Sequence, residues 1–510
     1  MLGLSRQSLG LWAGLACFVL ILLLPAPAGM GDAANKTAAV AALMICWWVT
    51  EAVHIGVTGL VPLAALPLLG VESSQAVSAR YANHLIFLFI GGFIIAQAME
   101  RWNLHRRIAL NIIVRFGSRP RPIVLGFMVA TAVLSMWISN TATTMMLLPM
   151  AMAVVNQLVP SAKVRGVADG QPAEQVARDT FGSVLLLGIA YAASIGGIGT
   201  VVGSPTTVAF LGFANEALPD LPQITFAQWS MVALPIVAVF LPVTWVYLCR
   251  FGARAPLSAV RFESSQDVVR SELASMGPMS VPQKRVLAVA SATGMLWILR
   301  APLQIGAVLI PGWSSLFPQP GAIHDSTVAM AMALLLFGVR SGASRKEGTH
   351  RLLAWRQVAR GTPWGIVFLI GGGFALAGAI TGSGLAGWVG QSLGALAGLP
   401  EWMLVVCVCV LVTTMTETTS NVATVLMLSP VVTAMCAELG VHPYLLLLPM
   451  AVTASFAFAL PVATPPNAII FSSRWITIPQ MARAGVALDV IGLLIVPLAV
   501  YALGTAALGI

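Results

Sequence analysis

Two short polar motifs stand in the middle of long apolar stretches. The first is Ser139-Asn140-Thr141, within SNTATTMMLLP, and the second is Ser420-Asn421-Val422, within SNVATVLMLSP. Their hydroxyl and amide oxygens, with backbone carbonyls freed at a helix break, are hard donors that suit a small cation such as Na⁺. A break also exposes a helix N-terminus, whose N–H groups and positive dipole end attract anions. The motifs therefore predict a place where cations and an anion are held together.

The two motifs belong to an internal repeat. Phe93 ends the run FIGGF and precedes Ser139 by 46 positions. Phe374 ends the matching run IGGGF and precedes Ser420 by the same 46 positions. The motif regions then align without a gap, which indicates two related halves.

Each copy also reaches a second helix breaker. The first reads Gly203-Ser204-Pro205 and the second Ala463-Thr464-Pro465. Proline inside an apolar span removes a backbone hydrogen bond and opens the helix. Glycine and proline are also common in ordinary packing of membrane helices. Four breakers in matched pairs favour discontinuous helices, which form the midplane sites of transporters built from inverted repeats.

The elements that position these motifs must cross a membrane. Of the 510 residues, 58% are hydrophobic and only 9% are charged, against about 25% charged residues in a soluble domain. So few charges cannot cover a soluble globule, so we expect an all-α polytopic membrane protein in the lipid bilayer. The net charge of +9 comes from short loops between apolar runs, and no basic face with interleaved aromatics predicts binding of nucleic acid.

Apolar runs of spanning length predict about eleven transmembrane helices besides the two motif blocks. The first run resembles a signal peptide, but we expect it to be retained because many spans follow. The predicted spans are 10–28, 36–53, 55–71, 82–100, 182–215, 229–249, 286–308, 325–339, 363–382, 443–471 and 484–508.

Basic residues predict the orientation of these spans. Four loops are rich in Lys and Arg: 101–121, 160–180 (which includes Lys163, Arg165 and Arg178), 250–285 and 340–360. The positive-inside rule places all four, with the N-terminus, in the cytoplasm, for a multi-pass protein of the cell's inner or plasma membrane.

Both motif blocks must return to the side from which they enter. The block 122–159 lies between two basic loops, so it forms either two short full spans or a re-entrant hairpin with the polar motif at its tip. The block 401–438 has no basic flank and is predicted to open to the outside. Two opposed hairpins with shared sequence indicate an inverted-topology repeat.

The surroundings of the motifs lack fixed positive charge. No Lys or Arg occurs in 122–162 or in 361–473, so a bound anion must be balanced by cations and helix dipoles. This favours a cation-coupled carrier of small anions. An enzyme would need paired acids, a nucleophile with its base or a P-loop, and the sequence has none of these. A passive channel fits two opposed hairpins less well than alternating access does.

Several runs resemble the divalent-anion:sodium symporter family, which includes sodium-coupled dicarboxylate and citrate carriers. They are SMWISNTATTMMLLP, GGIGTVVGSP, TETTSNVATVLML, ASFAFALPVATPPNAIIF and, near the start, WWVTEAVHIGVTGLVP. The resemblance covers nearly the whole chain. It implies a homodimer in which a scaffold holds a moving transport domain, as in an elevator.

The resemblance also implies a division of the chain. Residues 1–120 form the first scaffold part, and 121–249 form the first transport part, with hairpin 121–159 and broken helix 182–215. Residues 250–400 form the cytoplasmic loop and the second scaffold part. Residues 401–510 form the second transport part, with hairpin 401–438 and broken helix 443–471.

Two Na⁺ sites follow from the same resemblance. The first uses Ser135, Ser139, Asn140 and the backbone at Gly203, and the second uses Thr416, Thr419, Asn421 and the backbone at Ala463. The implied contacts of the substrate carboxylates are Asn140, Thr141, Ser204, Ser420, Asn421 and Thr464.

Two departures from the family pattern bear on the substrate. Val422 stands where many members have Thr, and Thr207 stands where Pro-Pro-Asn commonly ends. We therefore expect Na⁺-coupled import of succinate, malate or fumarate, with a second reading as a sodium-independent or proton-linked carrier or exchanger of citrate, sulfate or another oxyanion.

One buried acid stands beside the second motif. Glu417 lies three positions before Ser420 in apolar surroundings, where a carboxylate is costly and often functional. It could tune the second cation site, carry a proton or form a structural hydrogen bond to a neighbouring helix end.

Overall fold

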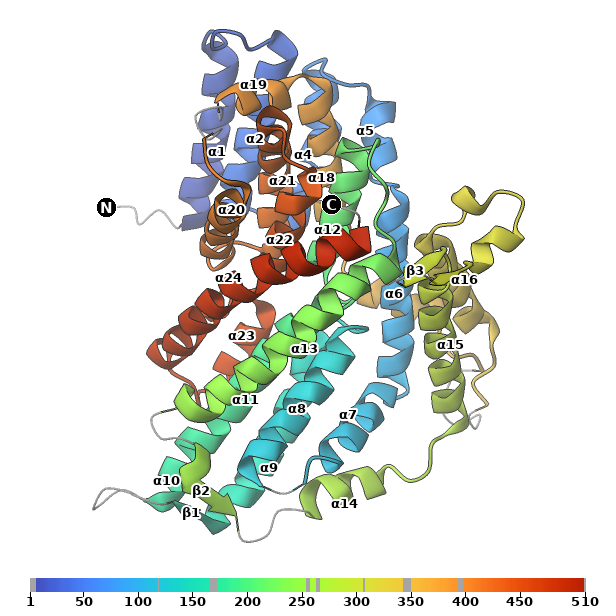
Figure 1. Cartoon of the computed structure of the whole chain (residues 1–510), viewed down its shortest axis with the longest axis vertical. Helices are drawn as coiled ribbons and strands as arrows, with labels where there is room; N and C mark the ends of the chain where they lie inside the picture. The colour runs from blue at the N-terminus through green and yellow to red at the C-terminus, as the bar shows by residue number, and fades with distance from the viewer. Residues whose placement is uncertain are drawn as a thin grey trace.

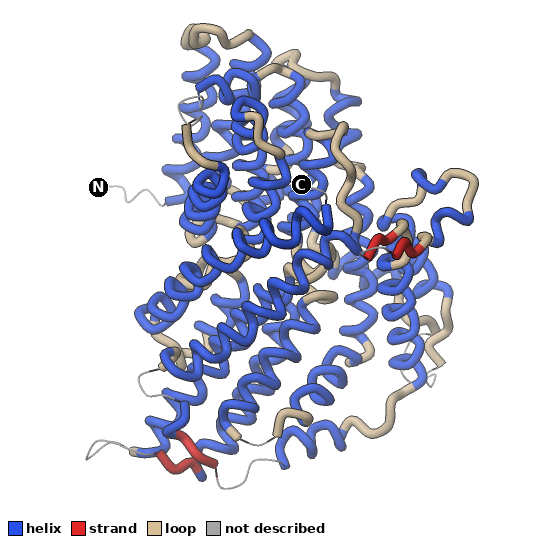
Figure 2. Tube along the Cα trace, in the orientation of Figure 1, coloured by secondary structure: helices blue, strands red, loops and turns tan. Residues whose placement is uncertain are grey.

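A computed structural model of the chain describes residues 6–117, 119–164, 172–253, 257–262, 267–305, 308–342, 350–392 and 398–508. These residues are mostly helical, as predicted. Figure 1 shows the long helices α13 (Phe226–Phe251) and α24 (Ile478–Leu508) running side by side obliquely across the molecule. The described strands form two short antiparallel ribbons, drawn red in Figure 2.

The first half of the chain has a hairpin pair and a broken helix. Its elements are α1 (Arg6–Leu23), α2 (Asp32–Thr50), α3 (Ile55–Thr58), α4 (Val61–Leu68), α5 (Ser74–Arg80), α6 (His84–Arg101), α7 (Leu104–Val114), α8 (Pro120–Ser135), α9 (Asn140–Leu158), η1 (Val159–Ser161), β1 (Ala162–Val164), α10 (Ala173–Ala177), η2 (Arg178–Gly182), α11 (Ser183–Gly197), α12 (Pro205–Ala217) and α13.

The second half repeats this order after a connecting region. Its elements are η3 (Leu257–Ala259), β2 (Val260–Phe262), α14 (Asp267–Ser275), α15 (Val281–Ile298), β3 (Leu303–Ile305), β4 (Val308–Ile310), η4 (Trp313–Leu316), η5 (Pro320–Ala322), α16 (Asp325–Gly338), α17 (Trp355–Gly361), α18 (Trp364–Gly382), α19 (Leu385–Ser392), α20 (Glu401–Thr416), α21 (Asn421–Leu439), α22 (Pro443–Thr453), α23 (Pro465–Phe471) and α24.

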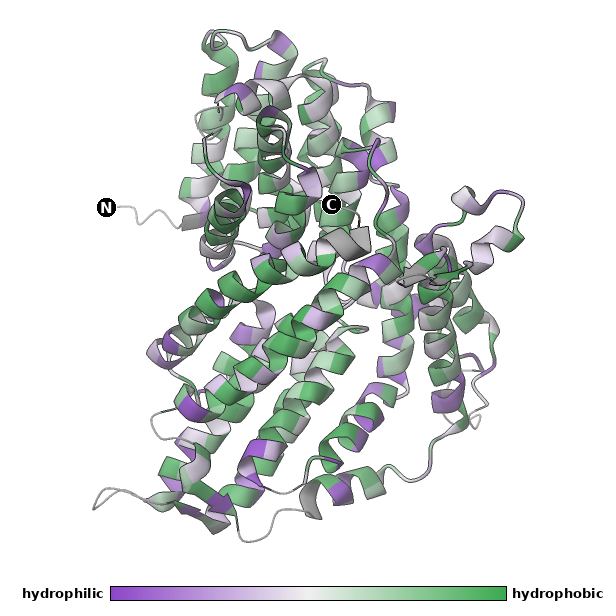
Figure 3. Ribbon diagram, in the orientation of Figure 1, coloured by the Kyte–Doolittle hydropathy of each residue, from purple (hydrophilic) through white to green (hydrophobic). Residues whose placement is uncertain are grey.

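The surface of the helices is that of a membrane protein. Seven helices of the described residues are long and apolar enough to cross a bilayer. Figure 3 shows hydrophobic residues along the helices and hydrophilic residues gathered at loops and helix ends. Large apolar side chains such as Leu494 and Leu498 of α24 are exposed, as expected for helices solvated by lipid. The prediction of a multi-pass membrane protein is confirmed, and the count of about eleven spans stays a prediction.

Both predicted hairpin blocks fold as pairs of helices. In the first, α8 ends at Ser135 and α9 begins at Asn140; in the second, α20 ends at Thr416 and α21 begins at Asn421. The helix breaks predicted at the polar motifs are therefore confirmed. Helices α8 and α20 have 16 residues each, or about 24 Å of helix, which is less than the roughly 30 Å of a hydrocarbon core. Their re-entrant course stays a prediction.

The second breakers interrupt helices as predicted. Residues 198–204, the first link, separate α11 from α12, and residues 454–464, the second link, separate α22 from α23. Pro205 and Pro465 occupy the first turns of α12 and α23, where a missing N–H costs nothing.

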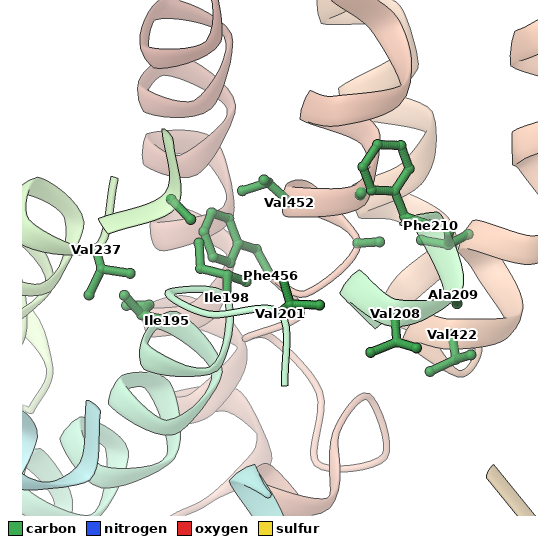
Figure 4. Packing of buried hydrophobic residues seen from close by; sticks show 14 of the residues in the cluster. Ile195, Ile198, Val201, Val208, Ala209, Phe210, Val237, Val422, Val452 and Phe456 are labelled. Carbon is green, nitrogen blue, oxygen red and sulfur yellow. The ribbon is translucent and has the colours of Figure 1, made fainter. Parts of the chain in front are cut away.

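The two halves interlock at these broken helices. Helix α12 of the first half packs against α21 and α18 of the second, while α23 of the second half packs against α9 and α11 of the first. Helix α11 is the centre of the core, because all its residues are buried. Figure 4 shows Ile195 of α11 and Ile198 of the first link beside Phe456 of the second half, and Val208 of α12 beside Val422 of α21.

The segment 101–121 differs from the expected loop. It contains α7, which buries Leu104, Leu110 and Ile113, and which also buries Arg107. The Arg107 guanidinium donates to Gln283 Oε1 at 3.0 Å. The sequence interpretation gave weight to the many basic residues of this segment and overlooked the helical spacing of its apolar residues. In the basic loop 160–180, Arg165 lies outside the described residues. Strand β1 of that loop pairs with β2 of the basic loop 250–285.

An ion-pair group within the first half ties α5 to the end of α12. Arg80 of α5 pairs with Glu72 and with Glu216, and its Nε lies 2.7 Å from Glu216 Oε1. The three side chains are between 15% and 27% exposed, so this group is largely shielded from solvent.

Candidate functional site

The break of the first hairpin gathers three oxygen atoms. Ser135 Oγ lies 2.5 Å from Asn140 Oδ1 and 2.7 Å from the carbonyl oxygen of Ala193. A serine hydroxyl carries one hydrogen, so it can satisfy only one of these two acceptors at a time. The cluster is therefore rich in lone pairs, which suits a small cation.

Local structure explains how these oxygens meet. Ser139 caps α9, and its Oγ accepts from Ala142 N at 3.3 Å, so Asn140 sits in the first turn of the helix. A Cβ at Gly197 would lie 2.4 Å from Asn140 Oδ1. Glycine is therefore needed at position 197, because a larger residue would push the asparagine amide away.

Gly203 brings the first link against the same cluster. A Cβ there would lie 2.5 Å from the carbonyl oxygen of Gly197 and 2.7 Å from that of Ser135. Thr200 holds this approach, because its hydroxyl donates to the carbonyl of Met136 and accepts from Gly203 N at 3.2 Å. Ser135, Asn140 and Gly203 thus lie together, and Ser139 stands at the adjoining cap.

The second hairpin repeats the oxygen cluster. Thr416 Oγ1 lies 2.8 Å from Asn421 Oδ1 and 2.8 Å from the carbonyl oxygen of Ala454. Thr416 is fully buried, and again one hydrogen serves two acceptors. Thr419, also buried, donates to Met415 O or shares a hydrogen bond with Thr424 Oγ1 at 2.7 Å.

The predicted substrate residues lie at helix N-termini. Asn140, Thr141 and Asn421 are in the first turns of α9 and α21, and Ser420 is the N-cap of α21. All four are half-buried. Ser204 and Thr464 cap α12 and α23, and their hydroxyl oxygens accept from Thr206 N and Asn467 N at 3.3 Å. Four helix N-termini without a neighbouring Lys or Arg in sequence can bind an anion through N–H groups and dipoles.

Both departures from the family pattern are buried. Val422 is 7% exposed in the first turn of α21, so the second motif offers an apolar side chain where the first offers Thr141. Thr207 and its counterpart Asn467 are both fully enclosed. Asn467 Nδ2 donates to the carbonyls of Ala457 and Leu460 at 3.0 Å each. Thr207 Oγ1 has no hydrogen-bond partner among the described residues.

Glu417 makes the structural hydrogen bonds considered from the sequence. Its two oxygens accept from Ala459 N at 2.9 Å and Leu460 N at 3.0 Å, both in the second link.

Several site residues were missed by the motifs. The carbonyls of Ala193 and Ala454 carry no side-chain signal, so only the fold could reveal them. Thr424 was visible, since it stands five positions after Thr419 and both clusters use a five-residue spacing. The described residues contain no group of three or more His, Cys, Asp and Glu side chains placed to hold a metal ion.

Comparisons with known proteins identify the family of the chain. The family model described as the sodium:sulfate symporter transmembrane region matches residues 5–507. The sodium-dependent dicarboxylate transporter SdcS of Staphylococcus saprophyticus is 38% identical over 504 residues, covering 99% of this chain and 92% of that protein. SdcS of Staphylococcus aureus strain MW2 is 38% identical over 508 residues, covering 99% and 93%.

Two solved transporters share the fold at low identity. The Alcanivorax borkumensis YdaH transporter has a TM-score of 0.55 at 13% identity, covering 94% of this chain and 99% of its own. Neisseria gonorrhoeae MtrF has a TM-score of 0.52 at 10% identity, covering 83% and 82%.

Proposed function

This chain belongs to the sodium:sulfate symporter family, and on that premise we propose that it imports small dicarboxylates such as succinate, malate or fumarate together with Na⁺. The observation that carries the proposal is the full-length similarity to proteins named sodium-dependent dicarboxylate transporters. The chain is a transporter and not an enzyme.

The paired oxygen clusters supply a physical reason for the coupling. Each cluster places an asparagine oxygen and a backbone carbonyl oxygen within 2.8 Å of one hydroxyl. Two Na⁺ ions, one at each cluster, would neutralise a dicarboxylate held at the N-termini of α9, α12, α21 and α23. Without the cations, the anion would face a site with no basic residue in the adjoining sequence.

The mode of movement extends this proposal. Helix pairs α8–α9 and α20–α21 act as opposed re-entrant hairpins within transport parts 121–249 and 401–510, carried by scaffold parts 1–120 and 250–400. Two copies form a homodimer, and each transport domain moves as an elevator. The basic loops and the N-terminus face the cytoplasm. The interlocking of α12 and α23 supports a single moving unit, because each half-helix packs on the other hairpin.

Uptake into proteoliposomes tests the function. Labelled succinate should accumulate when an inward Na⁺ gradient is imposed, and should not when K⁺ or choline replaces Na⁺. Accumulation that ignores Na⁺ would remove the coupling from the proposal.

A second candidate is a carrier or exchanger of citrate, sulfate or another oxyanion, independent of Na⁺ or linked to protons. Val422 and Thr207 favour it, because each replaces a polar group of the common family pattern near the site. Competition of labelled succinate uptake by citrate, sulfate and malate, with Na⁺, Li⁺ and pH varied, separates the two candidates.

A further inference from the structure

The two candidate cation sites are built unequally, and the difference lies in their links. From Gly196 to Ser204 the first link and its preceding turn contain four glycines. The second link, 454–464, contains none and includes Pro461. Glycine loses the most conformational freedom on ordering, and proline has little to lose. The second link is therefore closer to its bound conformation before any ion arrives.

Side-chain hydrogen bonds brace the second link. Glu417 accepts from two of its N–H groups, and Asn467 donates to the carbonyls of Ala457 and Leu460. These four bonds fix donors and acceptors on either side of Phe458, and the link continues from there to Ala463.

The first link lacks both devices at the matched positions. Met136 stands three positions before its motif serine, where the second repeat has Glu417, and Thr207 stands where the second repeat has Asn467. Its side-chain hydrogen bonds come from two residues. The Thr200 hydroxyl donates to Met136 O and accepts from Gly203 N, and Trp229 Nε1 donates to Ile198 O at 2.8 Å. The buried Thr207 hydroxyl has no hydrogen-bond partner among the described residues, so it does not bind the first link as Asn467 binds the second.

An aromatic cluster adds to the asymmetry. The Phe458 ring lies 5.1 Å from that of Tyr191, 5.6 Å from Phe456 and 5.9 Å from Phe240. At the position of Phe458 the first link has Ile198, which Figure 4 shows among aliphatic side chains and Phe456. Rings packed at these distances hold one conformation more firmly than a flexible glycine-rich turn does.

We infer that Glu417 and Asn467 are positioning residues that preorganise the second cation site, so that it binds Na⁺ first and more tightly, while the first site forms as its glycine-rich link orders around the second ion. This inference rests on the proposed function. It concerns the order of cation binding, because a site that is already ordered does not spend binding free energy on ordering.

The experiment uses the full-length protein in detergent, without dicarboxylate. Unfolding temperature is measured against Na⁺ concentration at constant ionic strength, with K⁺ as the replacement. We expect two phases of stabilisation separated by at least tenfold in Na⁺. Thr416→Val should move the phase at low Na⁺ to at least tenfold higher Na⁺, and Ser135→Ala should do the same to the phase at high Na⁺.

Exchanging the matched residues tests the positioning role. Asn467→Thr and Glu417→Met give the second repeat the residues of the first, and each should raise the Na⁺ concentration of the low phase about tenfold. Thr207→Asn should lower that of the high phase. In uptake at saturating Na⁺, the half-saturating succinate concentration should change less than twofold in Asn467→Thr and Glu417→Met, which a general loss of structure would not allow.

Amide hydrogen exchange of the wild-type protein without Na⁺ tests the inference without any substitution. The amides of Ala459 and Leu460 should exchange at least tenfold more slowly than those of Thr200 and Val201, although Val462 in the second link is 80% exposed. Faster exchange in the second link overturns the inference, as does a shift of the low phase in Ser135→Ala instead of Thr416→Val. These two results leave the Na⁺ coupling of the proposed function intact. If Na⁺ raises the unfolding temperature no more than K⁺ does, the coupling fails together with the inference.

Discussion

Replacing Thr416 with valine isolates one hydroxyl of the second oxygen cluster. Thr416 is fully buried, and valine has nearly the same shape, so the packing of α20 stays intact. The change removes the single hydrogen shared by Asn421 Oδ1 and Ala454 O, each 2.8 Å away. It also removes one oxygen that would face the cation.

The expected effect follows from these contacts. A contact to a charged group contributes about 1.5–3 kcal/mol, so the half-saturating Na⁺ concentration should rise about 10- to 150-fold. Leaving two buried acceptors without a donor should lower the free energy of unfolding in the absence of Na⁺ by about 1–3 kcal/mol. Succinate uptake should recover when Na⁺ is raised far enough.

Uptake into proteoliposomes at a series of Na⁺ concentrations measures the shift, and Thr131→Val is the matched control. Thr131 is equally buried on α8, and its hydroxyl donates within its own helix to Phe127 O at 2.6 Å. The control should leave the half-saturating Na⁺ concentration within about twofold of wild type, since a helix-internal bond contributes only about 1 kcal/mol to folding. An unchanged Na⁺ dependence in Thr416→Val would refute the assignment of this cluster to a cation.

Three further predictions concern the anion and the fold. Asn140→Ala and Asn421→Ala should each lose both Na⁺-dependent and succinate-dependent stabilisation, and normal uptake in either would remove that asparagine from the site. Val422→Thr adds one hydroxyl at the tip of the second hairpin and should change the ranking of competing anions by about 2- to 13-fold, the range of one hydrogen bond; an unchanged competition panel would place residue 422 away from the anion. Arg80→Gln leaves two shielded carboxylates without their cation and should lower the free energy of unfolding by about 1–3 kcal/mol, which is below the range for a fully buried pair. Adding Glu216→Gln should restore part of that loss. Equal stability of Arg80→Gln and wild type in thermal unfolding would contradict the prediction.

The breaks were predictable from the sequence because their causes are local. Proline at 205 and 465 and a capping hydroxyl before each end a helix whatever surrounds them. The spacing of Phe93 and Phe374 from their motifs revealed the repeat for the same reason: both copies carry it in the chain itself.

The contacts between segments could not be predicted in this way. The carbonyls of Ala193 and Ala454 complete the oxygen clusters, but every residue has a carbonyl, so no residue type marks them. Helix α7 was expected as a loop because its arginines outweighed its apolar face, and only packing explains how Arg107 is buried against Gln283. The partners of Glu417 are backbone N–H groups more than 40 positions away.

The interlocking of the half-helices also constrains how the chain is made. Helix α12 ends at Ala217, but its partner α21 begins only at Asn421, about 200 residues later. At about 5–20 residues per second, the ribosome needs roughly 10–40 s to synthesise that stretch. During this time the first half lies in the bilayer with its own oxygen cluster but without α18 and α21, the helices against which α12 packs in the complete chain. Synthesis of the second half therefore sets the time for which α12 lacks its packing partners.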